Sequence, residues 1–126
     1  MPQRSVIQPH NDREAVLSKA LIAAADIMGL SQALVAKALG ISESSVSRLR
    51  DGRYVLSEAR KEWELARLLV RIYRSLDAMM AGDEEALRAW LRNDNTALRG
   101  APIDLIASVE GLTRTVNYVD AYRARV

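Results

Sequence analysis

Apolar side chains recur every three or four residues along most of the chain, which is the spacing of one buried helix face. No stretch alternates between apolar and polar residues as a half-buried strand does. The pattern predicts helices over residues 12–28, two short helices within 30–52, a long helix over 58–81, and three shorter helices after Gly82. We therefore expect an all-α fold, in which an N-terminal helix-turn-helix bundle is linked by a long helix to a small helical C-terminal module.

Residues 30–52 carry the most specific local signals in the chain. Ser31 and Ser42 each stand where a hydroxyl can cap the start of a short helix. Gly40 lies between them, where the first helix must end in a left-handed conformation. The apolar residues of both helices have spacings that face inward: Leu34, Val35, Leu39, Ile41, Val46 and Leu49. This arrangement predicts a helix-turn-helix, although an ordinary helical hairpin with solvated polar residues would share part of it.

The second short helix keeps a polar outer face, which suits insertion into the major groove of DNA. The candidates for contacts to base edges are Ser44, Ser45, Ser47 and Arg48. Glu43 either accepts a hydrogen bond from cytosine N4 or simply favours the helix dipole. Arg50 and Arg53 are predicted to contact phosphates.

The segments Leu30-Ser31-Gln32, Leu39-Gly40-Ile41-Ser42 and Val46-Ser47-Arg48 together resemble the helix-turn-helix of the Xre/Cro/lambda-repressor family. The resemblance implies that Gln32 holds a phosphate or braces the recognition helix, and that operator double-stranded DNA is a partner. Such proteins usually bind two half-sites about one helical turn apart, so a homodimer is expected.

The long helix has a broader apolar stripe than the small N-terminal bundle can cover. A helix of about 24 residues would be roughly 36 Å long. We expect a second copy of the chain to share the burial of this stripe, at Trp63, Leu69, Ile72, Tyr73 and Leu76. The alternative is that the C-terminal module covers the same stripe within one protomer.

Composition and charge limit the kinds of site and partner that the chain can have. The chain has no cysteine, which excludes disulfides and thiolate metal sites. Its net charge is +2, and 15 of its 18 basic residues are arginine. The basic excess falls within residues 53–82, beside the helix-turn-helix, where phosphates would lie. Residues 1–11 are interpreted as a flexible arm without a signal core, and no apolar run could span a membrane, so a cytoplasmic protein is expected.

The sequence does not favour an enzyme. The only histidine, His10, lies in the arm, so neither a Ser-His pair nor a histidine metal site has support. Asp83, Glu84 and Glu85 stand at a helix start, where carboxylates favour the dipole, and this explains them better than acid/base chemistry. No glycine-rich phosphate loop follows a strand. We therefore expect no catalytic residues, no metal and no cofactor.

The C-terminal third carries a second pattern: Ala89-Trp90-Leu91, then residues 97–106 with Leu98, Gly100, Pro102 and Leu105, then Gly111-Leu112. It resembles the toxin-binding domain of the Xre/MbcA/ParS antitoxin family. The resemblance implies a RES-domain toxin that degrades NAD⁺, neutralised when the antitoxin covers its active site, and a toxin–antitoxin hetero-oligomer that binds its own operator. The resemblance covers about residues 20–122, and with the predicted helices it divides the chain into a helix-turn-helix region at 12–56, a connecting helix at 57–82 and a toxin-binding domain at 83–126.

The last helix is expected to start after a break at residues 108–111 and to bury Leu112, Val116 and Val119. The candidate toxin contacts are Glu110, Arg114, Asn117, Tyr118, Tyr122, Arg123, Arg125 and Val126. The carboxylate of Val126 or Glu110 would mimic the diphosphate of NAD⁺, while the arginines pair with acidic groups on the rim of the cleft. Alternatively, this helix only closes the core of the module and its last residues fray.

Two other functions remain open from the residues alone. The chain could be a stand-alone repressor whose C-terminal region only dimerises or senses a ligand. It could also be an interaction adaptor whose helix-turn-helix has lost DNA binding. Salt-dependent DNA binding separates the antitoxin and the repressor from the adaptor. Co-purification with a toxin separates the antitoxin from the repressor.

Overall fold

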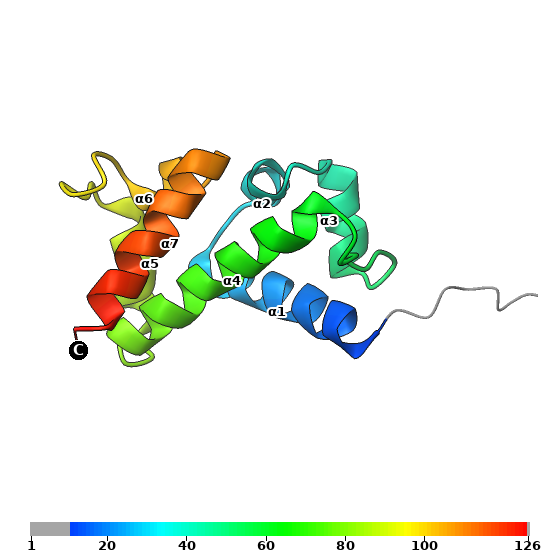
Figure 1. The fold of residues 1–126 in the computed structure, drawn as a ribbon, viewed down its shortest axis with the longest axis horizontal. Coiled ribbons are helices and arrows are strands. Elements are labelled where there is room, and N and C mark those ends of the chain that lie inside the picture. The colour runs from blue at the N-terminus through cyan, green and yellow to red at the C-terminus, as the bar shows by residue number, and fades with distance from the viewer. Residues whose placement is uncertain (1–10, 126) are drawn as a thin grey trace, which may run out of the picture.

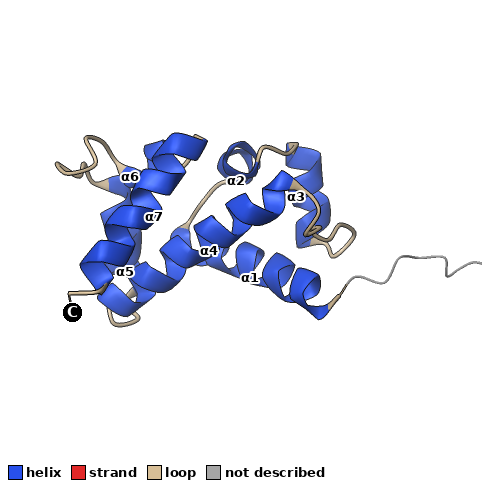
Figure 2. Ribbon diagram, in the orientation of Figure 1, coloured by secondary structure: helices blue, strands red, loops and turns tan. Residues whose placement is uncertain are grey.

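The computed structural model describes residues 11–125, and all of its regular elements in that range are helices (Figures 1 and 2). In chain order they are α1 (Asp12–Met28), α2 (Gln32–Leu39), α3 (Glu43–Arg50), α4 (Lys61–Met79), α5 (Glu84–Arg92), α6 (Pro102–Leu105) and α7 (Val109–Arg123). The all-α prediction is confirmed. Most of the predicted arm at 1–11, with His10, lies outside the described residues, as does Val126.

The turn between α2 and α3 forms as its residues predict. The Ser31 hydroxyl accepts a hydrogen bond from the Leu34 amide at 3.1 Å, and the Ser42 hydroxyl accepts one from the Ser45 amide at 3.0 Å. Gly40 ends α2 with a φ of 70°, a conformation that costs a residue with a Cβ atom more than it costs glycine. These local preferences set the two helices at their observed positions.

The long helix begins three residues later than predicted, at Lys61 rather than at residue 58. Residues 57–60 form a turn instead, in which the Arg60 amide donates to the Ser57 carbonyl at 3.0 Å. A tertiary contact explains the difference, because the Glu14 carboxylate of α1 accepts from the Glu58 amide at 2.8 Å. The turn is thereby fixed against α1, where a helix would have directed that amide elsewhere.

Helix α4 lies at the centre of the molecule, with α1 packed along one part of it and α7 along another (Figure 1). Trp63, Leu69, Ile72 and Leu76 are all buried in a single protomer, with Trp63 the most exposed at 6%. The prediction that a second copy covers these residues is therefore wrong, since α1, α2, α5 and α7 already pack against α4. Only Tyr73 of the predicted set is partly exposed.

The C-terminal helices also depart from prediction at one point. Helix α7 begins at Val109, capped by the Ser108 hydroxyl, which accepts from the Gly111 amide at 3.1 Å. The predicted break at 108–111 lies earlier, at residues 106–108, and Gly111 lies inside the first turn of α7. Its role is close packing, described below, rather than chain reversal.

Two arginines of α5 join the C-terminal helices to the end of α1. Arg88 and Arg92 donate to main-chain carbonyls of residues 26–29 at 2.7 to 3.2 Å. These carbonyls lie at the C-terminal end of α1, where acceptors lack the donors that a continuing helix would supply, and of the four only that of Asp26 also accepts the Gly29 cap amide, at 3.1 Å. No helix among residues 11–125 is both long enough and apolar enough to cross a membrane.

Candidate nucleic-acid interface and C-terminal surface

Helix α3 has one buried side and one exposed side. Val46 and Leu49 are buried against the rest of the bundle. The residues on the other side are exposed or half-exposed: Glu43, Ser44, Ser47 and Arg48. Four of the predicted DNA-contacting residues thus share one outward face of a two-turn helix, which has the width that a major groove admits.

Ser45 has a different position from the other predicted base contacts. Its hydroxyl is half-buried and accepts hydrogen bonds from the Ser42 hydroxyl at 3.0 Å and from Nη2 of Arg48 at 3.1 Å. Ser45 therefore holds the guanidinium of Arg48 close to α3 through Nη2, while the other N–H groups of this exposed guanidinium make no hydrogen bond within residues 11–125.

Gln32, at the start of α2, lies next to the start of α3. Its Nε2 donates to the Glu43 carbonyl at 3.3 Å. This geometry matches the bracing role that the family resemblance implies. The Gln32 side chain is also half-exposed, which leaves room for a phosphate contact.

The two predicted phosphate contacts are already ion-paired. Arg50 pairs with Asp26 of α1 at 3.0 Å, and this hydrogen bond raises the pKa of the Arg50 guanidinium above its usual value. Arg53 pairs with Asp51 at 2.9 Å. Arg50 lies on the side of α3 that faces α1, so the structure does not bring it into the row formed by Ser44 and Arg48.

The C-terminal surface has an aromatic row. Trp90 of α5 stacks on Tyr118 of α7 with ring centroids 6.2 Å apart, and Tyr118 is 6.3 Å from Tyr122. Tyr122 is 44% exposed, and Trp90 is only half-buried. Trp90 is not among the predicted toxin contacts, so it is a surface residue that the sequence reasoning missed. Its place beside Leu87 and Leu91, which are buried, hid the fact that it lies at the edge of their face.

The predicted toxin contacts are spread over α7 rather than gathered in one place. Glu110 lies in the first turn and Arg123 in the last, about 20 Å apart along the axis at 1.5 Å per residue. Arg114 is anchored to the neighbouring loop, because its Nη2 donates to the Leu98 carbonyl at 2.7 Å. Asn117 and Arg125 are exposed.

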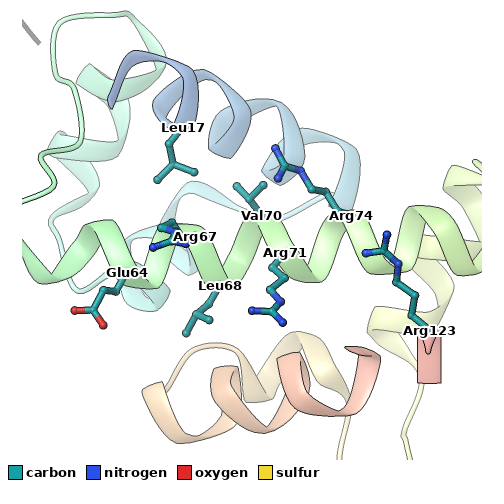
Figure 3. Close-up of a pocket in the computed structure, with 8 residues that line it drawn as sticks. All are labelled: Leu17, Glu64, Arg67, Leu68, Val70, Arg71, Arg74 and Arg123. Carbon is teal, nitrogen blue, oxygen red and sulfur yellow. The ribbon is translucent and has the colours of Figure 1, made fainter. Parts of the chain in front are cut away.

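Arg123 faces a different surface from Tyr118 and Tyr122. It lines a cavity of about 530 Å³ between α1, α4 and α7, together with Arg67, Arg71 and Arg74 of α4 (Figure 3). We call this surface the arginine groove. No residue of α3 lines it. The basic excess of residues 53–82 was predicted to lie beside the helix-turn-helix, and these three arginines of α4 border α1 rather than the recognition helix α3.

Comparison with protein families matches both halves of the chain. Residues 8–71 match the antitoxin Xre-like helix-turn-helix domain. Residues 75–125 match the antitoxin Xre/MbcA/ParS C-terminal toxin-binding domain. No individual curated protein matches the chain. The boundary between the two matches falls within α4, the helix that both halves share.

Proposed function

The chain belongs to the Xre-like antitoxin family, and we propose that it neutralises a RES-domain toxin that degrades NAD⁺ and represses its own operon through α3. The family gives it a DNA-binding domain and a toxin-binding domain. The identity of the toxin as a RES domain, the coverage of its active site and the autoregulation are parts of the proposal.

One observation carries the combination of the two activities. Helix α3, whose outward side is exposed, and the C-terminal end of α7 lie at opposite ends of the molecule (Figure 1). A protein partner bound at the far end of α7 would leave the outward face of α3 free. One protomer is thus able to hold DNA and a toxin at the same time, which autoregulation by a complex requires.

The DNA half of the proposal rests on the outward row of α3. Ser44, Ser47 and Arg48 contact base edges, with Arg48 suited to guanine. Glu43 either accepts from cytosine or supports the helix dipole, and Gln32 braces α3 or contacts a phosphate. Arg50 and Arg53 exchange their carboxylate partners for phosphates on binding. Two copies occupy half-sites about one helical turn apart, as a homodimer formed through a surface other than the buried stripe of α4.

The toxin half rests on α7 and the aromatic row. Aromatic side chains that are partly exposed are frequent anchors of protein interfaces. Tyr118 and Tyr122, with Trp90 behind them, form such an anchor, and the exposed Arg125 pairs with a carboxylate at the rim of the toxin cleft. Glu110 lies too far along α7 to share a narrow cleft with Arg125, so it contacts a separate part of the toxin.

Co-expression with the candidate RES toxin tests the proposal. The toxin alone should lower cellular NAD⁺, and the chain should restore it and co-purify with the toxin. The complex should bind the upstream DNA of the pair, with an affinity that falls as salt rises. A chain that binds this DNA but neither co-purifies with the toxin nor restores NAD⁺ is a stand-alone repressor. A chain that binds the toxin but no DNA is an adaptor, and the operator half of the proposal is then rejected.

A further inference from the structure

The arginine groove continues beyond the cavity drawn in Figure 3. A second hollow of about 210 Å³ adjoins it toward the start of α4, and the two share Leu17, Arg67 and Arg74. The combined groove follows α4 from Trp63 to Arg74, a span of roughly 17 Å at 1.5 Å per residue. It is therefore an elongated surface, with room for about three turns of a helix laid beside α4.

Three guanidinium groups of this groove lack carboxylate partners within residues 11–125. Arg71 pairs with Asp120 of α7 at 2.6 Å, and Glu64 at the groove edge pairs with Lys61 at 3.1 Å. No carboxylate among those residues lies within ion-pairing distance of Arg67, Arg74 or Arg123. Three unpaired cations around one hollow make a surface that favours an anionic partner.

The same groove has apolar walls. Leu17 points from α1 toward α4, and Leu68 lies between the arginines (Figure 3). Val16 beside it is 62% exposed, which is unusual for a large aliphatic residue of a bundle helix. An apolar wall with a cationic rim fits a partner that has both apolar and acidic side chains. A phosphate backbone would leave the apolar walls without a matching surface.

We propose that the arginine groove is the docking site for an acidic amphipathic helix of a partner protein. Arg67, Arg71 and Arg74 follow each other at spacings of four and three residues, so they form one row along α4. Carboxylates at the same spacings on a second helix would stand opposite this row, with aliphatic residues beside Leu17 and Val16. A second copy of this chain is a poor occupant, because a symmetric pairing would bring the unpaired arginines against each other.

This site is separate from the surfaces in the proposed function. It includes neither the outward row of α3 nor the aromatic row, and only Arg123 belongs to both the groove and the predicted toxin contacts. The test therefore uses Arg67 and Arg74 alone, and its outcome is independent of NAD⁺ rescue.

The test measures binding of a fluorescein-labelled helical peptide with Leu on one face and Glu at spacings of four and three residues. The variant Arg67→Glu/Arg74→Glu reverses two groove charges. The control Lys19→Glu/Arg99→Glu reverses two exposed charges outside the groove, so the net charge of both variants is equal. We expect the groove variant to raise the peptide Kd at least about tenfold relative to the control. Equal Kd values for the two variants would overturn the proposal, provided that circular dichroism shows both to be folded.

A charge-reversed pair, in which the protein carries Glu and the peptide carries Lys, identifies the class of partner. The same peptide with Lys in place of Glu should bind the groove variant more tightly than it binds the unaltered protein. A short DNA duplex is the competing probe. If the groove variant weakens duplex binding more than the control does, and acidic-peptide binding is unchanged, the occupant is a nucleic acid and the proposal is wrong.

Discussion

The α-carbon of Gly111 in α7 lies directly against the main-chain carbonyl of Leu105 at the end of α6. A Cβ atom built on Gly111 would stand 2.0 Å from the Leu105 oxygen and 2.7 Å from its carbon. Both of those atoms belong to the backbone, so no side-chain rotation relieves the overlap. The close packing of α6 on α7, and with it the shape of the C-terminal module, depends on the absence of a side chain at this position.

Gly111→Ala should lower the free energy of unfolding by at least about 3 kcal/mol, because α6 and α7 must separate to admit the methyl group. The matched control is Gly100→Ala, where the nearest atom is a side-chain carbon of Leu105 at 3.7 Å, an ordinary contact distance. Urea denaturation measures both variants. Equal stabilities for the two variants would show that α6 and α7 accommodate the extra methyl group at little cost, and would contradict the prediction.

Replacing both Arg88 and Arg92 by alanine should destabilise the protein by about 1–3 kcal/mol, because the last carbonyls of α1 lose their charged donors. It should also loosen the C-terminal helices from the helix-turn-helix. Hydrogen exchange at residues 26–30 measures the loosening. Arg125→Ala removes an exposed guanidinium that makes no hydrogen bond within residues 11–125, and it should leave stability and exchange unchanged.

Stability should fall as the pH rises from 10 to 12, because burial and a hydrogen bond to Glu62 raise the pKa of the Tyr54 hydroxyl to about 12 from 10.0. In that interval the unfolded chain releases the Tyr54 proton while the folded chain keeps it, so alkali favours unfolding. Tyr54→Phe should make this fall shallower. Tyr122→Phe, at an exposed tyrosine, is the control. The measurement is urea denaturation across this pH range. The prediction is contradicted if the free energy of unfolding of both variants falls with pH as steeply as that of the unaltered protein.

Arg48→Ala should weaken operator binding by about 1–3 kcal/mol and relax the preference at one base pair, if Arg48 reads a guanine. Lys61→Ala, which removes a cation of α4 outside the groove, should change the affinity little. Electrophoretic mobility shifts with a set of operator variants measure both quantities. Undiminished affinity in the combined Ser44, Ser45 and Arg48 alanine variant would place the DNA interface elsewhere.

Removal of residues 122–126 should abolish protection from the toxin while leaving the fold and operator binding intact. The buried residues of α7, Leu112, Val116 and Val119, all precede the cut. The deletion removes the exposed end of the aromatic row and Arg123 and Arg125. Cell survival with the toxin is the measurement, and Thr113→Ala at the other end of α7 is the control. Full protection by the shortened chain would move the toxin contact to residues 83–119.

Local sequence signals were enough for the helix-turn-helix. Capping by Ser31 and Ser42, and chain reversal at Gly40, depend on atoms within a few residues, so they are visible without tertiary context. The same holds for Pro102 at the first position of α6 and for Asp83 at the start of α5. The buried line of α7 was likewise predictable, because it follows the helical period.

Several features depended on contacts between residues far apart in the chain. The start of α4 moved to Lys61 because Glu14 binds the amide of Glu58, 44 residues away. The stripe of α4 was correctly identified as apolar, but periodicity cannot say which surface covers it. Here the covering surface belongs to the same protomer.

The sequence by itself thus determined the helices, the turn of the helix-turn-helix and the polar face of α3, since each follows from propensities and caps within about one or two turns. Only the tertiary structure decided which charges are free. It paired Arg50 with Asp26, placed Arg67, Arg71 and Arg74 in a groove with Arg123, and put Gly111 against a carbonyl rather than in a break. The reason is physical: a charge or a glycine acquires its role from the neighbours that folding brings to it, and those neighbours are distant in sequence.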